Sequence, residues 1–304
     1  MNLSENAAAR SLHMEALPNA RELGGYVTED GREVVRGRLL RTAALAKASP
    51  EDLRRLSEEY QLKLILDLRD PREAAEKPDP DIPGARYVNI PIIDPDSFDV
   101  IDPDEDGAAK AAGGSGKQEA AKSGEERKRE RFLAAADTFH ELTEAFDGDG
   151  LYSMLLMSPF GSGGYRRFFR EILSAPEGAV LWHCSQGKDR TGIAAALLLA
   201  ALGVSEETIL SDYLLTNEFC GDRIGRAKEM LSGYGYAEEL IDSTALTMEG
   251  ATEAYMCRLF AEVKKACGTM RHFLRERLLL SEEDLAVIRE RFLVPVRPEE
   301  DCAL

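Results

Sequence analysis

An apolar strand, a short polar loop and an apolar helix follow one another between residues 179 and 203. Ala179–Cys184 (AVLWHC) is apolar, which is typical of an interior strand of a sheet. Thr191 opens the run TGIAAALLLAALG, which predicts a buried helix that ends at Gly203. A loop between such elements directs successive backbone N–H groups inward, and the helix N-terminus adds positive potential. The segment therefore predicts an anion-binding turn.

The loop carries the side chains that phosphate chemistry needs. It reads HCSQGKDRTG from His183 to Gly192. Its environment favours the thiolate form of Cys184, which is a strong nucleophile. Arg190, six residues further on, can fold back and offer two parallel donors to phosphate oxygens. The eight fixed positions of HCxxGKDRTG would match by chance roughly once in 10^10 windows, so this pattern is specific.

Two other sequence patterns give no support for a second catalytic site or for a nucleotide-binding site. Cys220 and Arg226 (CGDRIGR) repeat the cysteine-to-arginine spacing, but they lie in a segment that predicts a helix, so we assign them no catalysis. The nucleotide-binding pattern GxxxxGK[ST] fails at two positions, because Asp189 replaces the hydroxyl residue and Trp182 replaces the first glycine.

The loop resembles the active-site loop of the bacterial atypical tyrosine phosphatases, a family with relatives active on phosphoserine, phosphothreonine and phosphoinositides. Three further segments are similar to elements of that family: Asn19–Gly25 (NARELGG, with Glu22 replacing aspartate), Asp67-Leu68-Arg69, and Asp212-Tyr213 with Thr216-Asn217. The resemblance covers about Glu15 to Leu293, apart from the segment near 95–130.

The resemblance implies phosphomonoester hydrolysis in two steps, without a metal or an organic cofactor. Cys184 is expected to form a phosphocysteine, while Arg190 and the loop N–H groups hold the oxygens. Asp189 is the expected general acid. Asp70, at the end of DLRD, and Asp94, after a candidate strand, are the alternatives.

The rest of the loop is expected to bind the phosphate, and other residues to support it. The expected phosphate-binding residues are Ser185, Gln186, Gly187, Lys188, Thr191 and Gly192. Thr191 is also expected to donate a hydrogen bond to the cysteine sulfur, and Lys188 to add charge at the pocket rim. The expected supporting residues are His183, Arg21, Asp67 and Arg69, with surface ion pairing as the alternative for the last three.

Strands alternating with helices predict an α/β fold, with a mostly parallel central sheet flanked by helices and a helical C-terminal part. By the resemblance this fold is tyrosine-phosphatase-like. We expect a single phosphatase domain over residues 1–304, in which 237–295 are helical. Residues 95–130 are acidic, small and polar, which predicts a flexible insertion. Helices are expected to follow it at 132–146 and 165–173.

Composition limits the partners. A formal net charge of −17 argues against general affinity for nucleic acid or for an acidic membrane. The five cysteines show neither zinc-site nor disulfide spacing, and the N-terminus lacks the pattern of a signal peptide, so we expect a cytoplasmic location. The longest apolar stretch, residues 193–202, is too short to span a membrane.

The expected substrate is a phosphorylated protein, a phosphoinositide or a small phosphoester, and the oligomeric state stays open. Two alternatives come from other classes. One is a phosphate-binding pseudophosphatase or adaptor, which the Glu22 replacement and the insertion leave possible. The other is sulfur transfer of the rhodanese type, which the continuation Lys-Asp-Arg-Thr-Gly disfavours.

Overall fold

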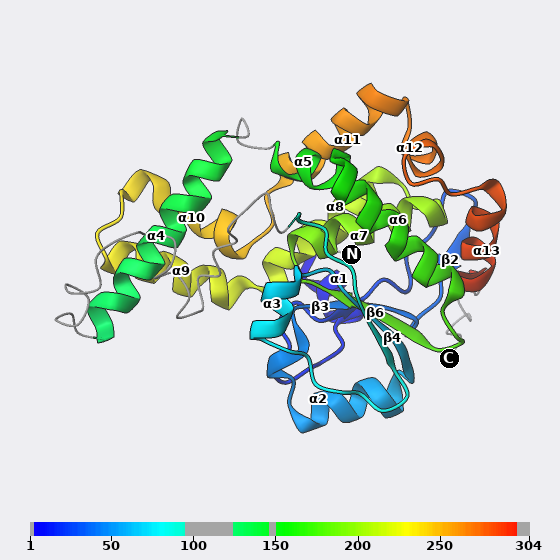
Figure 1. The fold of residues 1–304 in the computed structure, drawn as a ribbon, viewed down its shortest axis with the longest axis horizontal. Coiled ribbons are helices and arrows are strands. Elements are labelled where there is room, and N and C mark those ends of the chain that lie inside the picture. The colour runs from blue at the N-terminus through cyan, green and yellow to red at the C-terminus, as the bar shows by residue number, and fades with distance from the viewer. Residues whose placement is uncertain (1–2, 95–123, 146–149, 297–304) are drawn as a thin grey trace, which may run out of the picture.

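The computed structural model describes residues 3–94, 124–145 and 150–296. Its centre is a five-stranded sheet in the order β1-β3-β6-β4-β5 (Figure 1). The strands are β1 (Arg21–Glu22), β3 (Leu39–Thr42), β6 (Ala179–His183), β4 (Leu62–Asp67) and β5 (Arg86–Asn89). The last four run parallel, and only β1 at the edge is antiparallel. The predicted α/β fold with a mostly parallel sheet is confirmed.

Helices account for most of the remaining described residues. The N-terminal half contains α1 (Leu3–Arg10), the 3₁₀ turn η1 (Leu45–Lys47), α2 (Pro50–Arg54) with its π-helical continuation η2 (Arg55–Glu59), α3 (Pro71–Glu76) and α4 (Gly124–Ala145). The C-terminal half contains α5 (Leu151–Met157), α6 (Pro159–Ser174), α7 (Asp189–Leu202), α8 (Glu206–Phe219), α9 (Gly221–Gly233), α10 (Glu238–Glu249), α11 (Glu253–Cys267), α12 (Met270–Glu276) and α13 (Glu282–Phe292).

Side chains of the central strand β6 alternate between two hydrophobic cores, as the two-residue period of a strand requires. Val180 and Trp182 join a large core to which α5–α8 and α11–α13 contribute. Ala179 and Leu181 join a smaller core with η1, η2 and residues near the N-terminus. Figure 1 accordingly shows α6 and α7 on one side of the sheet and α2 on the other. Burial on both faces explains why this strand is continuously apolar.

Helices α4, α9 and α10 form a lobe that projects to the left of the sheet in Figure 1. They share a small core of their own, built from Ala135, Ala136, Ala227, Leu231, Ala245 and Met248. Its alanines allow the helices to approach closely, but they bury little apolar surface.

Local residues cap the helices around the sheet, and the predicted end of α7 at Gly203 is confirmed. Ser49 caps α2 through a capping box, and the Ser205 side chain accepts the N–H of Thr208 at the start of α8. Gly203 ends α7 with a φ of 87°. Each residue satisfies backbone groups that the helix itself leaves unpaired.

Three expectations need correction. Most of the predicted insertion, 95–123, lies outside the described residues, but its last seven residues, 124–130, are helical because α4 begins at Gly124. The helix expected at 165–173 starts earlier, at Pro159, since Ser158 caps it. The part expected to be helical over 237–295 ends in a strand, β7 (Leu293–Pro295), which pairs with β2 (Arg32–Val34).

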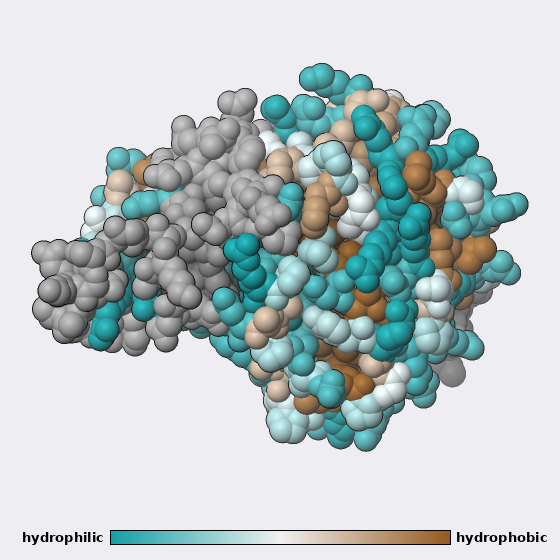
Figure 2. Space-filling model, in the orientation of Figure 1, coloured by the Kyte–Doolittle hydropathy of each residue, from teal (hydrophilic) through white to brown (hydrophobic). Residues whose placement is uncertain are grey.

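The surface view in Figure 2 shows hydrophilic residues over most of the coloured part of this face, with hydrophobic residues in smaller separate areas. A chain with 31% charged residues is expected to present such a surface. No helix in the described ranges is both long and apolar enough to cross a membrane.

Candidate active site

The candidate loop begins where the parallel strands end. Thr42, His183, Asp67 and Asn89 are the last residues of β3, β6, β4 and β5, and the strand register places them in one row. Cys184 follows directly from this row and is 3% exposed. Ligand sites of parallel sheets lie beyond the carboxyl ends of the strands, so Cys184 stands at such a place.

Gly187 makes the tight turn of the loop possible. Its φ is +67°, and a Cβ there would lie 2.3 Å from the carbonyl oxygen of Thr42. The carbonyl of Gly187 accepts hydrogen bonds from Asn19 Nδ2 at 2.8 Å and from Arg41 Nη2 at 2.9 Å. These two bonds hold the peptide group after Gly187 in place.

Helix α7 leaves the loop without a side-chain cap on its N-terminus. Its first N–H groups have no partner within the helix, and such groups bind anions. Gly192 lies in the first turn, where a Cβ would be 3.2 Å from the ring of Tyr213 on α8. A glycine at this position therefore lets α8 pack closely against the start of α7.

A buried ion cluster lies behind the loop. Asp212 on α8 pairs with Arg41 Nη1 at 3.1 Å and with Arg21 Nε at 3.4 Å. Burial alone would raise the pKa of Asp212, but Arg21 and Arg41 hold it below its ordinary value. Arg21 also donates to the side chain of Asn19, which in turn holds Gly187. The segments at 19–25 and 212–217 thus meet behind the loop.

Arg190 lies in the first turn of α7 and folds back toward the loop, where its guanidinium pairs with a carboxylate. Its Nη1 and Nη2 donate to Glu73 Oε2 at 2.6 Å and Oε1 at 2.9 Å. Burial opposes the charge of Arg190, but Glu73, Cys184 and Asp189 together hold its pKa well above the ordinary value. The guanidinium is therefore charged and fixed beside the loop.

Asp189 is held by Tyr152 of α5, whose hydroxyl also contacts that of Tyr213 on α8. Its Oδ1 accepts the hydroxyl of Tyr152 at 2.5 Å, and the Tyr152 hydroxyl lies 2.8 Å from that of Tyr213. Burial and then Asp189 raise the pKa of Tyr152 well above its ordinary value, so its hydroxyl stays protonated and remains a donor. The carboxyl of Asp189 therefore has a fixed orientation at the loop–helix junction.

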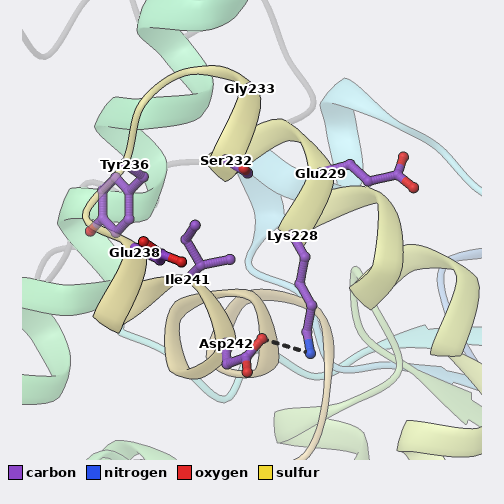
Figure 3. Close-up of a pocket in the computed structure, with 8 residues that line it drawn as sticks. All are labelled: Lys228, Glu229, Ser232, Gly233, Tyr236, Glu238, Ile241 and Asp242. Atoms are coloured by element: carbon purple, nitrogen blue, oxygen red, sulfur yellow. Dashed lines mark ion pairs between the residues drawn. The ribbon is translucent and has the colours of Figure 1, made fainter.

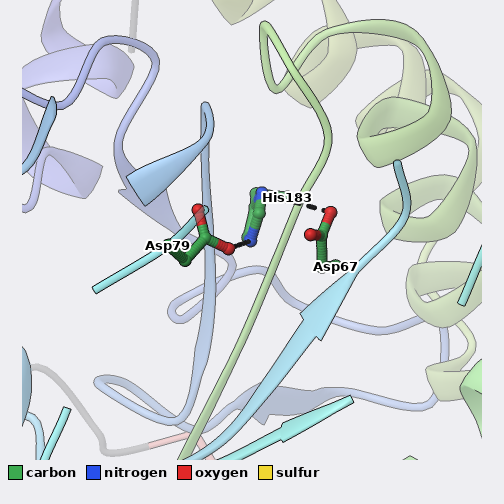
Figure 4. A group of neighbouring side chains, drawn as sticks. All are labelled: Asp67, Asp79 and His183. Atoms are coloured by element: carbon green, nitrogen blue, oxygen red, sulfur yellow. Dashed lines mark ion pairs between the residues drawn. The ribbon is translucent and has the colours of Figure 1, made fainter. Parts of the chain in front are cut away.

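His183 lies between two aspartates under the loop (Figure 4). Its Nε2 is 2.8 Å from Asp79 Oδ2, and its Nδ1 is 3.8 Å from Asp67 Oδ1. Arg69 pairs with both carboxylates, at 2.8 Å from Asp67 and 3.1 Å from Asp79. Burial alone would raise the pKa of Asp67, but His183, Arg69 and Tyr87 hold it below its ordinary value.

The same three ligand-type side chains, Asp67, Asp79 and His183, bring their ligand atoms within 4.8 Å of one another, as a metal site would. The guanidinium of Arg69 already supplies a positive charge to both carboxylates. We therefore interpret the group as a structural ion cluster. Because Arg21, Asp67 and Arg69 are all buried, surface ion pairing is excluded for them.

Two loop side chains expected at the phosphate instead contact α10. Lys188 is buried, and its Nζ donates to the carbonyls of Thr247 and of Met248, the latter at 3.2 Å. With its amide turned to satisfy both groups, Gln186 donates to the same Met248 carbonyl at 2.9 Å. The Lys188 ammonium therefore contacts α10 carbonyls and also lies 3.6 Å from Asp189 Oδ2, and its expected charge at the pocket rim stays a prediction.

Thr191 is fully buried, and its hydroxyl has no hydrogen-bond partner among the described residues. The expected hydrogen bond from Thr191 to the sulfur of Cys184 is therefore not formed here. The Thr191 carbonyl instead accepts the indole N–H of Trp182 at 3.2 Å, which ties α7 to β6.

The two alternative acids differ in their surroundings. Asp70 caps α3 by accepting the N–H groups of Arg72 and Glu73, and burial followed by Glu73 raises its pKa. Asp94 is half-buried at the end of the described segment that follows β5. Neither belongs to the loop itself, whereas Asp189 does.

A separate hollow of about 1040 Å³ lies between α9 and α10 (Figure 3). Its lining includes Lys228, which pairs with Asp242 at 2.9 Å, and also Glu229 and Glu238. This lining mixes opposite charges and contains no cysteine, so we place the candidate active site at the Cys184 loop.

Comparison with known proteins agrees with this placement. A family model described as the tyrosine phosphatase family matches residues 12–294. The chain belongs to the tyrosine phosphatase family. That match includes the whole loop from His183 to Gly192.

Individual relatives of this tyrosine phosphatase extend over most of the chain. A Cupriavidus necator protein named as a tyrosine-protein phosphatase is 30% identical over 287 residues, covering 93% of this chain and 88% of the relative. The triple specificity protein phosphatase PtpB of Mycobacterium tuberculosis is 26% identical over 254 residues, covering 79% and 85%. A tyrosine-protein phosphatase of Nostoc commune is 42% identical over 55 residues, covering 18% and 19%.

Sequence reasoning missed several residues that surround the loop of this phosphatase. They are Arg41, Glu73 and Asp79. Only Glu73 carries a local signal, because Asp70-Pro71-Arg72-Glu73 is the start of a capping box. That signal predicts a helix and says nothing of which loop the glutamate reaches.

Proposed function

We propose that this chain hydrolyses phosphomonoesters through a phosphocysteine formed on Cys184. One arrangement carries the proposal: Cys184 directly follows the central strand, its loop leads into the uncapped start of α7, and Arg190 is charged and folded back beside the loop. A tetrahedral dianion suits such a place, because amide donors and a guanidinium both stabilise its oxygens.

The reaction would proceed in two displacements. In the first, the Cys184 thiolate attacks phosphorus, the bond to the leaving oxygen breaks, and that oxygen takes a proton from an acid. In the second, water attacks the phosphocysteine and gives a proton to the same carboxylate. The sulfur–phosphorus bond breaks, orthophosphate leaves and the thiolate is restored.

Asp189 is the acid that we propose. It lies one residue before Arg190, and its side chain is 29% exposed, so a leaving group can reach it. Tyr152 holds the carboxyl in place. Asp70, in contrast, is committed to the N-terminus of α3.

We infer a phosphoprotein substrate, with phosphotyrosine as the first candidate because of the family. The relative PtpB is named as a triple specificity phosphatase, which supports testing phosphoserine, phosphothreonine and phosphoinositides beside it. The family match over 12–294 also supports a single phosphatase domain, and we propose a cytoplasmic site of action.

The test is hydrolysis of para-nitrophenyl phosphate by the purified protein, with and without a chelator. We expect chelator-resistant activity that vanadate inhibits and that Cys184→Ser abolishes. Mass spectrometry of the acid-quenched reaction should detect a phosphate on the peptide that contains Cys184. An inert wild-type protein that still binds orthophosphate would instead support the pseudophosphatase or adaptor alternative.

A further inference from the structure

Glu73 on α3 and Arg190 on α7 form a two-pronged ion pair. The contacts are 2.6 Å and 2.9 Å, and each side chain is 9% exposed. The same carboxylate accepts the hydroxyl of Ser185, and Ser185 lies 3.5 Å from Arg190 Nη2. A residue from a distant helix is therefore bonded to both ends of the phosphate loop.

The carboxylate of Glu73 is saturated with donors. Oε1 accepts from Arg190 Nη2 and from Ser185, while Oε2 accepts from Arg190 Nη1 and from the backbone N–H of Asp70 at 3.0 Å. The last bond belongs to the capping box of α3, whose first residue is Pro71. Two oxygens offer about four acceptor sites in all, so the carboxylate is fully used.

The donors of Arg190 are used only in part. A guanidinium has five N–H groups, and the hydrogen bonds of Arg190 to described residues come from Nη1 and Nη2. Glu73 thus takes the end of the group and leaves the side that carries Nε. On that side the Nε–H is parallel to a second N–H of Nη2, whose other contact is Ser185 Oγ at 3.5 Å, a long distance for a hydrogen bond. Two such parallel donors match two phosphate oxygens.

We propose that Glu73 is a positioning residue for phosphate binding: it holds the end of the Arg190 guanidinium so that the Nε side faces the substrate phosphate. This inference rests on the proposed function, since it assigns Arg190 to the phosphate. Sequence analysis gave Glu73 no role.

The opposite role, in which Glu73 competes with phosphate for Arg190, fits the contacts less well. A competing carboxylate would have to leave when substrate binds. The N–H of Asp70 and the hydroxyl of Ser185 would then lose their hydrogen-bond acceptor. Burial opposes the ionisation of Glu73, but Arg190 and Ser185 hold its pKa well below the ordinary value. It therefore stays charged and bonded.

The positioning role and the competing role predict opposite changes in the orthophosphate affinity of the full chain when Glu73 is replaced. Glu73→Ala removes a negative charge close to the anion site, so electrostatics alone, or relief of competition, would tighten binding. Loss of positioning weakens binding instead, by roughly 10- to 100-fold, as expected when hydrogen bonds to a charged group are lost. Glu73→Gln keeps one acceptor oxygen for Arg190 and should fall between the wild type and Glu73→Ala.

The matched control is Glu76→Ala, which removes the same charge from an exposed position of the same helix. It should bind orthophosphate within about twofold of the wild type, since exposed charges are screened. Circular dichroism at the assay temperature checks folding, and Glu73→Gln serves as the test variant if Glu73→Ala unfolds.

Unchanged or tighter orthophosphate binding by the folded Glu73 variants, with an active wild type, would overturn this inference alone. A wild type that neither turns over para-nitrophenyl phosphate nor binds orthophosphate would overturn the proposed function as well.

Discussion

Two segments of this chain share one spacing and almost nothing else. Cys184 precedes Arg190, and Cys220 precedes Arg226, by six residues. Cys184 follows the central strand, and Arg190 is buried against Glu73. Cys220 lies between helices α8 and α9, and Arg226 is exposed in the second turn of α9.

The electrostatic settings of the two cysteines also differ. Burial raises the pKa of Cys220, with only partial opposition from nearby arginines, so this thiol stays neutral. Cys184 in contrast lies in the loop that also carries the charged Arg190. Helix α9 after Cys220 also starts without a side-chain cap, so the preceding strand and the turn at Gly187 are what distinguish the candidate loop from a segment with the same spacing.

The sharpest way to break the comparison is to change both arginines conservatively. Arg190→Lys should lower kcat/KM for para-nitrophenyl phosphate by about 10^3-fold, because lysine cannot offer two parallel donors. Arg226→Lys should leave it within about twofold. Equal losses in steady-state assays of the two variants would mean that the second segment also serves the reaction.

The second largest effect is expected for the buried ion pairs behind the Cys184 loop. Asp212→Asn leaves Arg21 and Arg41 without their carboxylate, so we expect the free energy of unfolding to fall by about 3 kcal/mol at pH 7. Asp222→Asn, at an exposed position beside Cys220, should cost less than about 0.5 kcal/mol. Urea denaturation of the two variants measures both values.

The pH dependence of Asp212→Asn follows from the sign of the pKa shift. The folded-state pKa of Asp212 lies below 3.8, so its contribution is complete above that pH and is lost as pH falls further. The stability gap between wild type and variant should therefore narrow below pH 3.8. A constant gap down to pH 2 would contradict the assigned ion pairs.

Glycines give a smaller contrast. Gly187→Ala places a Cβ against the Thr42 backbone at a positive φ, and should cost about 2 kcal/mol of stability together with activity. Gly225→Ala in α9 meets nothing within 4 Å and should stabilise the helix by up to about 1 kcal/mol. Thermal unfolding followed by circular dichroism should show opposite signs.

The smallest expected effect concerns the proposed acid. Tyr152→Phe removes the hydroxyl that holds Asp189, and kcat should fall about fivefold, which corresponds to ~1 kcal/mol. Tyr234→Phe, in the turn after α9, is the control and should change nothing. An unchanged kcat for Tyr152→Phe would argue that another carboxyl donates the proton.

The features that could be predicted from the sequence are those that depend on residues close together in the chain. The strand, the loop and α7 with its end at Gly203 follow from neighbouring residues. Glu73 acts on Arg190 across 117 positions, and β7 pairs with β2 across the whole fold. Local patterns do not encode such contacts. The start of α4 was missed because a charged, alanine-containing segment resembles both a linker and an exposed helix.

The row of strand ends under the loop also has a consequence for how the chain selects its fold. Asp67 stands opposite His183 in the β4–β6 register, and Arg69 reaches both Asp67 and Asp79. A slip of one residue between these strands would invert every side chain and leave buried charges without counterions. The hydrophobic strands alone tolerate such a shift more easily, so the ion cluster penalises misaligned folds.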